Sequence, residues 1–203
     1  MIMITKEQFR KDATFKIEDD EFVLLVYSKL FGKEMYLKVI PEEPDEVNEK
    51  DGITDRIIEI GNDLINLDSS NLTLIRETVW KCFNRYIELC SFTLNIDDER
   101  YEKGEITKDE YEALNRERTQ DLYEIYSEDD CWNKIGEPEY RTCIFPRIWN
   151  HRFGFITFYP EWEEVGLNIL VRNGEIIGYA NGLDPIIRKF DNPKLKSVYE
   201  LWD

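Results

Sequence analysis

The stretch Phe153–Ala180, FGFITFYPEWEEVGLNILVRNGEIIGYA, contains the clearest β-sheet signal in this chain. Short apolar and aromatic runs alternate with turn residues, which is typical of consecutive strands. Asn173-Gly174 separates Leu167–Arg172 from Glu175–Ala180. Because Asn and Gly both tolerate positive φ, this pair predicts a type I′ hairpin turn. We therefore expect two or three antiparallel strands here, at the centre of a sheet.

More strands are expected on either side of this stretch in the sequence. Ala13–Ile17 and Glu21–Tyr27 are rich in apolar and β-branched residues, and Met35–Ile40 alternates between a drier and a wetter face. Tyr140–Phe145 has the composition of a strand. Pro146 follows it, so we expect this strand to lie at a sheet edge or to end there.

Two helices are expected in the middle of the chain. One covers residues 55–66 and is capped by Thr54 or Asp55, and the other covers residues 71–91. Both repeat apolar residues three or four positions apart, and we expect the second to lie across the sheet as its main cover. The predicted fold class is α+β, with a mainly antiparallel sheet built from an N-terminal hairpin and C-terminal strands and covered by these helices. We expect a single domain over residues 1–203, with an acidic helical insertion at about 97–130.

The charge is strongly negative and concentrated in two segments. The 203 residues include 43 acids and 26 bases, for a formal net charge of −17. Glu42–Asp55 holds seven acids and one base, and Asp97–Asp130 holds fourteen acids and five bases. A polyanion repels phosphate backbones, so direct nucleic-acid binding is not expected. A basic protein is the partner that such patches favour.

The second acidic segment contains a predicted helix over residues 107–126. Thr107 and Glu110 match the capping box, in which each side chain satisfies a free backbone N–H of the first turn. A narrow apolar stripe, interrupted by Arg118, consists of Tyr111, Leu114, Leu122, Ile125 and Tyr126. The opposite face is either simply solvated or binds a partner. For the second alternative the candidate binding residues are Asp109, Glu110, Glu117 and Asp121.

No motif for catalysis, a cofactor or a metal is found in the sequence. There is no G-x-S-x-G elbow, phosphate-binding loop, dinucleotide fingerprint or H-E-x-x-H pair. His151 is the only histidine, and Cys82, Cys90, Cys131 and Cys143 form no C-x-x-C pair. We expect buried free thiols and name no catalytic residue, cofactor or metal ligand.

Neither a membrane span nor a secretory signal is found in the sequence. No apolar run approaches the length of about 18 residues that a span requires. The N-terminus becomes polar after four residues and has no basic start. A cytoplasmic protein that does not contact membranes is therefore expected.

Trp162 and the carboxylates around it are the remaining candidate site. Glu163 and Glu164 follow Trp162 near the expected centre of the sheet. A pair of carboxylates is the catalytic group that a glycosidase-type hydrolase uses. The alternative is structural. In that interpretation Trp162 anchors the core, with its indole N–H hydrogen-bonded, and the two glutamates belong to a polar turn.

Glu161–Leu167 (EWEEVGL), followed by the hairpin at Asn173-Gly174, resembles a late turn in a family of uncharacterised bacterial domains. The similarity extends to an early F-G-K-E hairpin and strand, as in Phe31–Ile40, and to a helical pair, as in Ile53–Cys90. Val165 stands where the family often has His, so a role of that His does not transfer.

This resemblance covers about half of the chain and leaves Asp97–Asp130 as an insertion. The family has no assigned reaction. Its similarity to small acidic proteins encoded beside bacterial toxins implies a toxin-neutralising role. We therefore expect a non-enzymatic acidic binding protein of the immunity type, whose partner is a basic toxin or nuclease. The alternatives are a nucleic-acid mimic that blocks a DNA-binding enzyme, and a carboxylate-dependent hydrolase.

Overall fold

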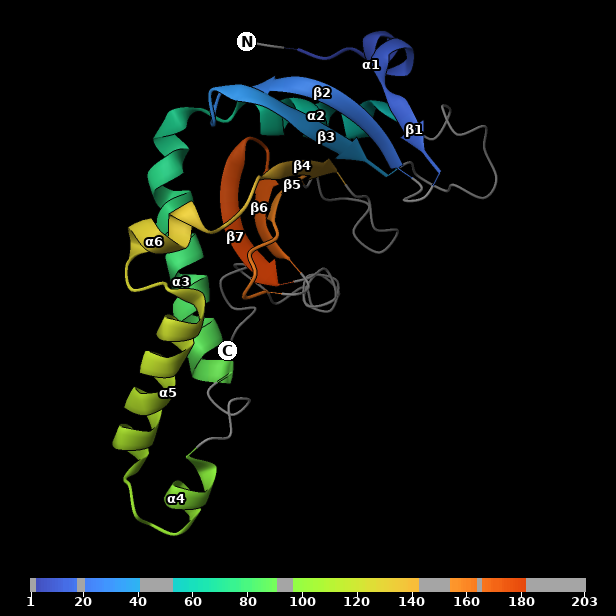
Figure 1. Ribbon diagram of the computed structural model, residues 1–203. Helices are drawn as coiled ribbons and strands as arrows, with labels where there is room; N and C mark the ends of the chain where they lie inside the picture. Colours follow the sequence, from blue (N-terminus) through green and yellow to red (C-terminus); the bar gives the residue numbers. More distant parts are fainter. Residues whose placement is uncertain are drawn as a thin grey trace, which may run out of the picture. The chain divides into compact units, whose positions relative to one another are not determined.

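The computed structural model describes residues 3–17, 21–40, 53–90, 97–142, 154–163 and 166–181 (Figure 1). Most of the acidic loop at 42–55 lies outside these ranges, as do Cys143, His151, Glu164 and Val165. The chain divides into two compact units. We call Met1–Thr73, Glu137–Tyr159 and Val165–Asp203 the sheet unit, and Leu74–Gly136 with Pro160–Glu164 the helical unit. The prediction of a single domain stays a prediction.

The sheet unit contains one mostly antiparallel sheet, whose strands follow one another in chain order among the described residues (Figure 1). The strands are β1 Thr14–Lys16, β2 Glu21–Ser28, β3 Lys33–Val39, β4 Glu139–Thr142, β5 Gly154–Phe158, β6 Leu167–Arg172 and β7 Glu175–Asn181. Only β3 and β4 run parallel, with Leu37 opposite Tyr140. A parallel pair needs a long crossover, and here the chain between Val39 and Glu139 contains several helices. The predicted α+β class is confirmed.

The predicted hairpin turn is confirmed in its geometry. Asn173 and Gly174 both have positive φ, at 52° and 77°, and they join β6 to β7. One prediction of strand position is wrong, because the C-terminal strands β5–β7 form one end of the described sheet rather than its centre. For the strand expected over residues 140–145, the edge alternative is excluded, because β4 lies between β3 and β5. The other alternative, that this strand ends at Pro146, lies outside the described residues.

Helix α2, Asp55–Asn66, packs on the sheet. Its N-cap is Thr54, whose side-chain oxygen accepts a hydrogen bond from Ile57 N at 3.3 Å. Ile57, Ile60 and Leu64 are buried on its inner face. Gly154 of β5 permits the close packing, because a Cβ there would lie 2.7 Å from Leu64 Cδ1.

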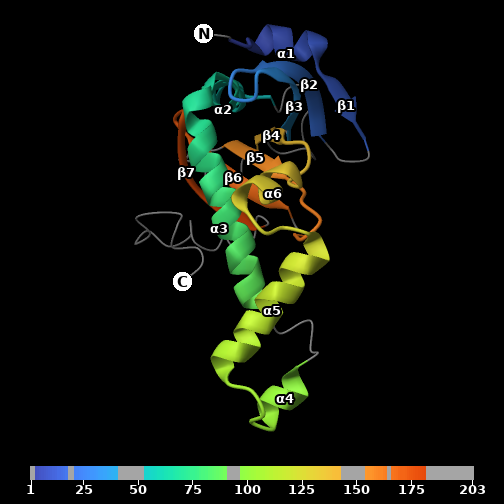
Figure 2. The ribbon, with the colours of Figure 1, turned by 60° about the vertical axis from the view of Figure 1, so that its left-hand side comes forward.

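The longer helix α3, Leu72–Cys90, was expected to cover the sheet, and this expectation stays a prediction. From Leu74 onward it belongs to the helical unit. The other helices are α1 Lys6–Asp12, the 3₁₀ turn η1 Ser69–Asn71, α4 Asp98–Glu102, α5 Lys108–Tyr123 and α6 Glu128–Asn133. Figure 2 shows α5 beside the C-terminal half of α3, with α4 beyond the start of α5. Side-chain hydrogen bonds join α3 to α5, from Arg116 Nη1 to Asn84 Oδ1 at 2.9 Å and between the Tyr86 and Tyr123 hydroxyls at 3.0 Å.

Candidate functional site

The start of α5 is fixed by the predicted capping box. Thr107 Oγ1 accepts a hydrogen bond from Glu110 N at 3.3 Å, and Glu110 Oε2 accepts one from Thr107 N at 2.8 Å. The bond from the Thr107 backbone lowers the pKa of Glu110 below its usual value, because it stabilises the charged form. The local sequence therefore determines which way the first turn of α5 presents its carboxylates.

The four carboxylates proposed from the sequence lie on one side of α5. Asp109, Glu110, Glu117 and Asp121 are all exposed, and we call them the acidic face. At 3.6 residues per turn they fall within an arc of about 120°. The rise per residue places Asp109 and Asp121 about 18 Å apart along the axis, and Glu117 and Asp121 about 6 Å apart. The arrangement is a stripe of negative charge along the helix.

The acidic face is not neutralised by the basic residues that the structure describes. None of its four members forms an ion pair with a described residue, whereas other acids of the segment do, among them Glu112 and Glu124. Glu112 Oε1 lies 3.4 Å from Lys108 Nζ, and Glu124 Oε2 lies 2.9 Å from Lys134 Nζ. Asp121 Oδ1 accepts a hydrogen bond from the Tyr126 hydroxyl at 2.9 Å, which raises the pKa of Tyr126. The face therefore keeps most of its charge for a partner in solvent.

The predicted apolar stripe of this segment is partly wrong. Tyr111 and Ile125 are buried, but Leu122 and Tyr126 are exposed, at 60% and 58%. The buried side of α5 instead includes the polar residues Asn115 and Thr119.

Arg118, which interrupts the stripe, makes an ion pair with the buried Asp97. Asp97 Oδ1 also accepts a hydrogen bond from Arg100 Nη1 at 3.0 Å, so one carboxylate joins α4 to α5.

Trp162 belongs to the core of the helical unit, as the structural alternative predicts. Its side chain is 2% exposed, and its ring centroid lies 5.4 Å from that of Phe83 and 5.7 Å from that of Tyr86. The expected hydrogen bond of its indole N–H is not made to any described residue. Glu163 is half-buried, and Glu164 lies outside the described residues.

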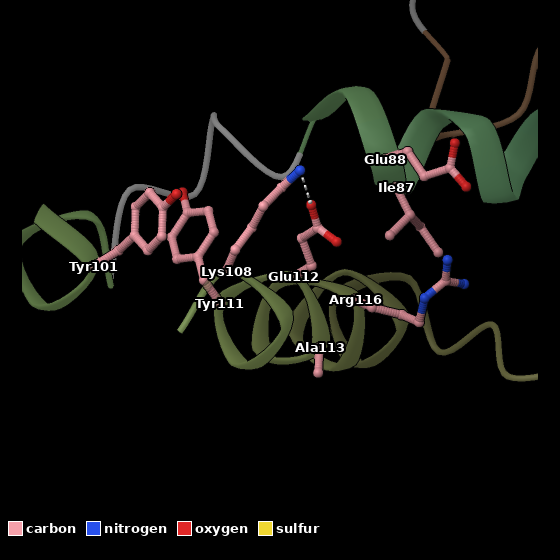
Figure 3. Close-up of a pocket in the computed structure, with 8 residues that line it drawn as sticks. All are labelled: Ile87, Glu88, Tyr101, Lys108, Tyr111, Glu112, Ala113 and Arg116. Carbon is pink, nitrogen blue, oxygen red and sulfur yellow. Dashed lines mark ion pairs between the residues drawn. The ribbon is translucent and has the colours of Figure 1, made fainter. Parts of the chain in front are cut away.

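The helical unit contains a cavity of about 540 Å³ that no sequence pattern predicted (Figure 3). Its walls come from Ile87 and Glu88 of α3, from Tyr101 of α4, and from Lys108, Tyr111, Glu112, Ala113 and Arg116 of α5. Figure 3 shows the two tyrosine rings at one end, Arg116 at the other, and Lys108 with Glu112 between them. The lining residues are 29 positions apart at the extremes, so only the folded chain brings them together.

The groups at the two ends of the cavity differ in character. Tyr101 and Tyr111 stack with centroids 5.0 Å apart and planes at 23°. The Tyr111 hydroxyl donates to Asp98, and this bond raises the pKa of Tyr111. At the other end Arg116 donates to the side-chain oxygen of Asn84. The cavity thus offers an aromatic wall and a guanidinium in one space.

A charged cluster in the sheet unit was also missed by sequence reasoning. Glu21 is 1% exposed and lies 3.4 Å from Lys38 Nζ and 3.2 Å from Arg141 Nη2. Lys38 Nζ is also 3.0 Å from Glu139. Burial alone lowers the pKa of Lys38, but the hydrogen bonds and charges of Glu139 and Glu21 together raise it above its usual value. Two acids and two bases balance one another here, which is typical of a structural ion-pair network.

Cys82 and Cys131 have no feature of a reactive site. Cys82 and Cys131 are buried free thiols, as predicted. Burial raises the pKa of Cys82 well above its usual value and that of Cys131 to about 12, so both stay protonated at neutral pH.

Neither a metal-binding cluster nor a membrane-spanning helix is found within the described ranges. No group of three or more His, Cys, Asp or Glu side chains there is placed to hold a metal ion. No helix in the same ranges has the length and apolar character needed to cross a bilayer.

No family model, no curated protein and no solved structure matches this chain.

Proposed function

We propose that this chain is a non-enzymatic acidic binding protein that covers a basic protein through the acidic face of α5. The observation that carries the proposal is that four exposed carboxylates share one side of the helix without an ion pair to any described residue. Such a stripe raises the rate of encounter with a positively charged surface and makes affinity fall as salt rises. Exposed Tyr126 beside Asp121 adds an aromatic side chain of the kind enriched at interfaces.

The partner that best fits this chemistry is a basic toxin or nuclease, and the chain would act as its immunity-type protein in the cytoplasm. The resemblance of Glu161–Leu167 and the following hairpin to toxin-associated bacterial domains supports this choice. The overall charge of −17 supports it as well, because long-range attraction depends on the whole field of the molecule.

A pull-down from the native cells at low and at high salt tests the proposal. The decisive variant is Asp109→Asn/Glu117→Gln, which removes two charges from the acidic face without touching the capping box. Its matched control is Glu77→Gln/Glu102→Gln, which removes two exposed charges from α3 and α4 of the same unit. We expect a basic protein to be retained at low salt by the parent and the control, and lost at high salt or with the decisive variant. Recovery of no basic protein at either salt would overturn the proposal.

A nucleic-acid mimic is the second candidate, and the one-sided stripe favours it specifically. Glu117 and Asp121 lie about 6 Å apart along the helix axis, so the stripe presents successive negative charges along one line, as a phosphate backbone does. In this case the partner is a DNA-binding enzyme, and duplex DNA must compete with the chain for it. If partner binding is unaffected by excess duplex DNA, the mimic is excluded and the immunity-type proposal remains.

A further inference from the structure

The cavity between α3, α4 and α5 is separate in its residues from the acidic face. Its volume of about 540 Å³ is in the range of small-molecule sites, which is about 300–1,000 Å³. Such sites combine an apolar or aromatic wall with a few polar groups that fix orientation. Here the stacked pair Tyr101–Tyr111 and the side chain of Ile87 supply the first property, and Arg116 supplies the second.

Among the described residues, Arg116 is the one charged side chain of the cavity lining without an oppositely charged partner. Lys108 pairs with Glu112 at 3.4 Å, and Glu88 pairs with Arg85 at 3.2 Å. Each of the four other arginines of the helical unit has a carboxylate partner (Arg76, Arg85, Arg100 and Arg118). For Arg116 no carboxylate partner occurs within the described ranges, although acids outnumber bases 43 to 26 in the chain. In a chain with so many acids, most basic side chains are expected to find a carboxylate partner. An arginine without one is therefore more unusual than a carboxylate without a basic partner.

The Arg116 guanidinium is held in place by neutral groups. Its Nη1 donates to Asn84 Oδ1 at 2.9 Å, and Asn84 Nδ2 donates to the Trp80 carbonyl oxygen at 2.8 Å. A guanidinium has five N–H donors in a planar fork that matches a carboxylate. The contact with Asn84 uses one edge, so the other donors are available to an anion in the cavity.

The tyrosine pair supplies a supported flat surface at the opposite end. Tyr111 is buried and its hydroxyl is held by Asp98, whereas Tyr101 is 42% exposed. Tyr111 and Arg116 are five residues apart on α5, which is about 7.5 Å along the helix axis. A ligand that reaches both ends therefore has a planar ring and an anionic group joined by a short chain.

We propose that this cavity binds a planar aromatic monocarboxylate, with its ring against Tyr101 and its carboxylate on Arg116. A single negative charge matches the single unmatched guanidinium. A multiply charged anion is disfavoured, because Asp97–Asp130 carries fourteen acids against five bases. This site goes beyond the proposed protein-binding function and does not depend on it.

Calorimetry and ¹⁵N NMR titration with indole-3-propionate test the site on the full chain. The comparison probes are indole-3-propionamide, which lacks the charge, butyrate, which lacks the ring, and phenyl phosphate, which carries more charge. We expect saturable binding of indole-3-propionate alone among these at comparable concentrations. The shifted amide signals should cluster in residues 84–90 and 98–117.

Two variants locate the binding in the cavity. Arg116→Gln removes the guanidinium, and Lys81→Gln is its matched control, because Lys81 is an exposed cation of α3 outside the cavity lining. We expect Arg116→Gln to weaken binding at least about tenfold, as loss of a charge-assisted pair does, and Lys81→Gln to leave it unchanged. Tyr101→Leu, at a partly exposed ring, should also weaken it. Equal binding of the amide, tighter binding of phenyl phosphate, or unchanged affinity in Arg116→Gln would overturn the proposal.

Discussion

Gly154 is a residue at which α2 and β5 approach closely. A Cβ at this position would lie 2.7 Å from Leu64 Cδ1, 2.8 Å from Leu64 Cγ and 3.0 Å from Ile60 Cγ2. These atoms belong to buried side chains of a packed helix face, so they have little room to move. The absence of a side chain is therefore what allows α2 to lie so near the sheet.

Gly154→Ala is expected to destabilise the chain by about 1–3 kcal/mol through overpacking, measured by urea denaturation. Leu64→Ala alone should cost about 2–5 kcal/mol because it opens a cavity. In the double variant Gly154→Ala/Leu64→Ala, the added methyl fills part of the cavity. The double variant should therefore lose less stability than the sum of the losses of the two single variants. Strict additivity would contradict the close contact, since residues that touch are expected to couple.

Asp97 acts between helical elements, where it joins Arg100 of α4 and Arg118 of α5. Burial alone raises its pKa, but the hydrogen bonds and charges of the two arginines together hold the pKa below its usual value. A carboxyl with a depressed folded pKa stabilises the folded state above its unfolded pKa, near 4. That stabilisation is lost as the pH falls through the folded pKa.

We therefore expect Asp97→Asn to lower the urea midpoint at pH 7 and to shift amide signals of α4 and the start of α5. The gap between the variant and the parent should narrow as the pH falls from about 4 through the lower folded pKa, because below that pKa both carry a neutral side chain. Glu102→Gln, at an exposed acid of α4, is the control and should leave the midpoint close to that of the parent. A gap that stays constant down to low pH would contradict the role of the charge.

The sequence predicts elements well where the signal is local. The bounds of α2 were predicted from Thr54 and from the spacing of Ile57, Ile60 and Leu64, and the structure agrees. The capping box similarly located the start of α5 and so the exposed acids Asp109 and Glu110. The buried side of α5 was predicted less well, because Asn115 and Thr119 are polar and give no apolar period.

The cavity was missed for a different physical reason. Its aromatic end depends on α4, a helix of five residues that has no strong periodic signal, and on the stacking of Tyr101 upon Tyr111. Its charged end depends on Arg116 having no carboxylate partner in the described part of the chain. That property cannot be read from a sequence in which acids are abundant. Which charges find partners is decided only when distant helices pack.

At the scale of the whole molecule, strand order was the other property that local patterns did not settle. Pro146 suggested an edge or an end for the strand before it, whereas β4 pairs with both β3 and β5. Pairing between Val39 and Thr142 depends on contacts formed after the intervening chain has folded back. The local sequence patterns predicted the α+β fold class, whereas the order of the strands in the sheet depends on pairing between distant parts of the chain.

The net charge of −17 predicts how salt affects the stability of the whole chain. Between about 10 mM and 150 mM salt the screening length falls from about 30 Å to about 8 Å, which weakens the repulsion among the excess acids. Exposed ion pairs are also weakened, but each contributes only about 0–1 kcal/mol. We expect the urea midpoint to rise with sodium chloride over this range. A falling midpoint would show that the ion pairs outweigh the repulsion.

The parallel pairing of β3 with β4 also affects how the chain is made. About 100 residues separate the two strands, so at about 5–20 residues per second a ribosome delivers the second strand roughly 5–20 seconds after the first. Throughout that interval the outer edge of β3 has no neighbour and can recruit another nascent chain. Lys33, Glu34 and Lys38 put charges along this strand, and charged side chains on an open edge discourage such pairing. The same residues therefore protect the growing polypeptide during the period when it is most prone to aggregate.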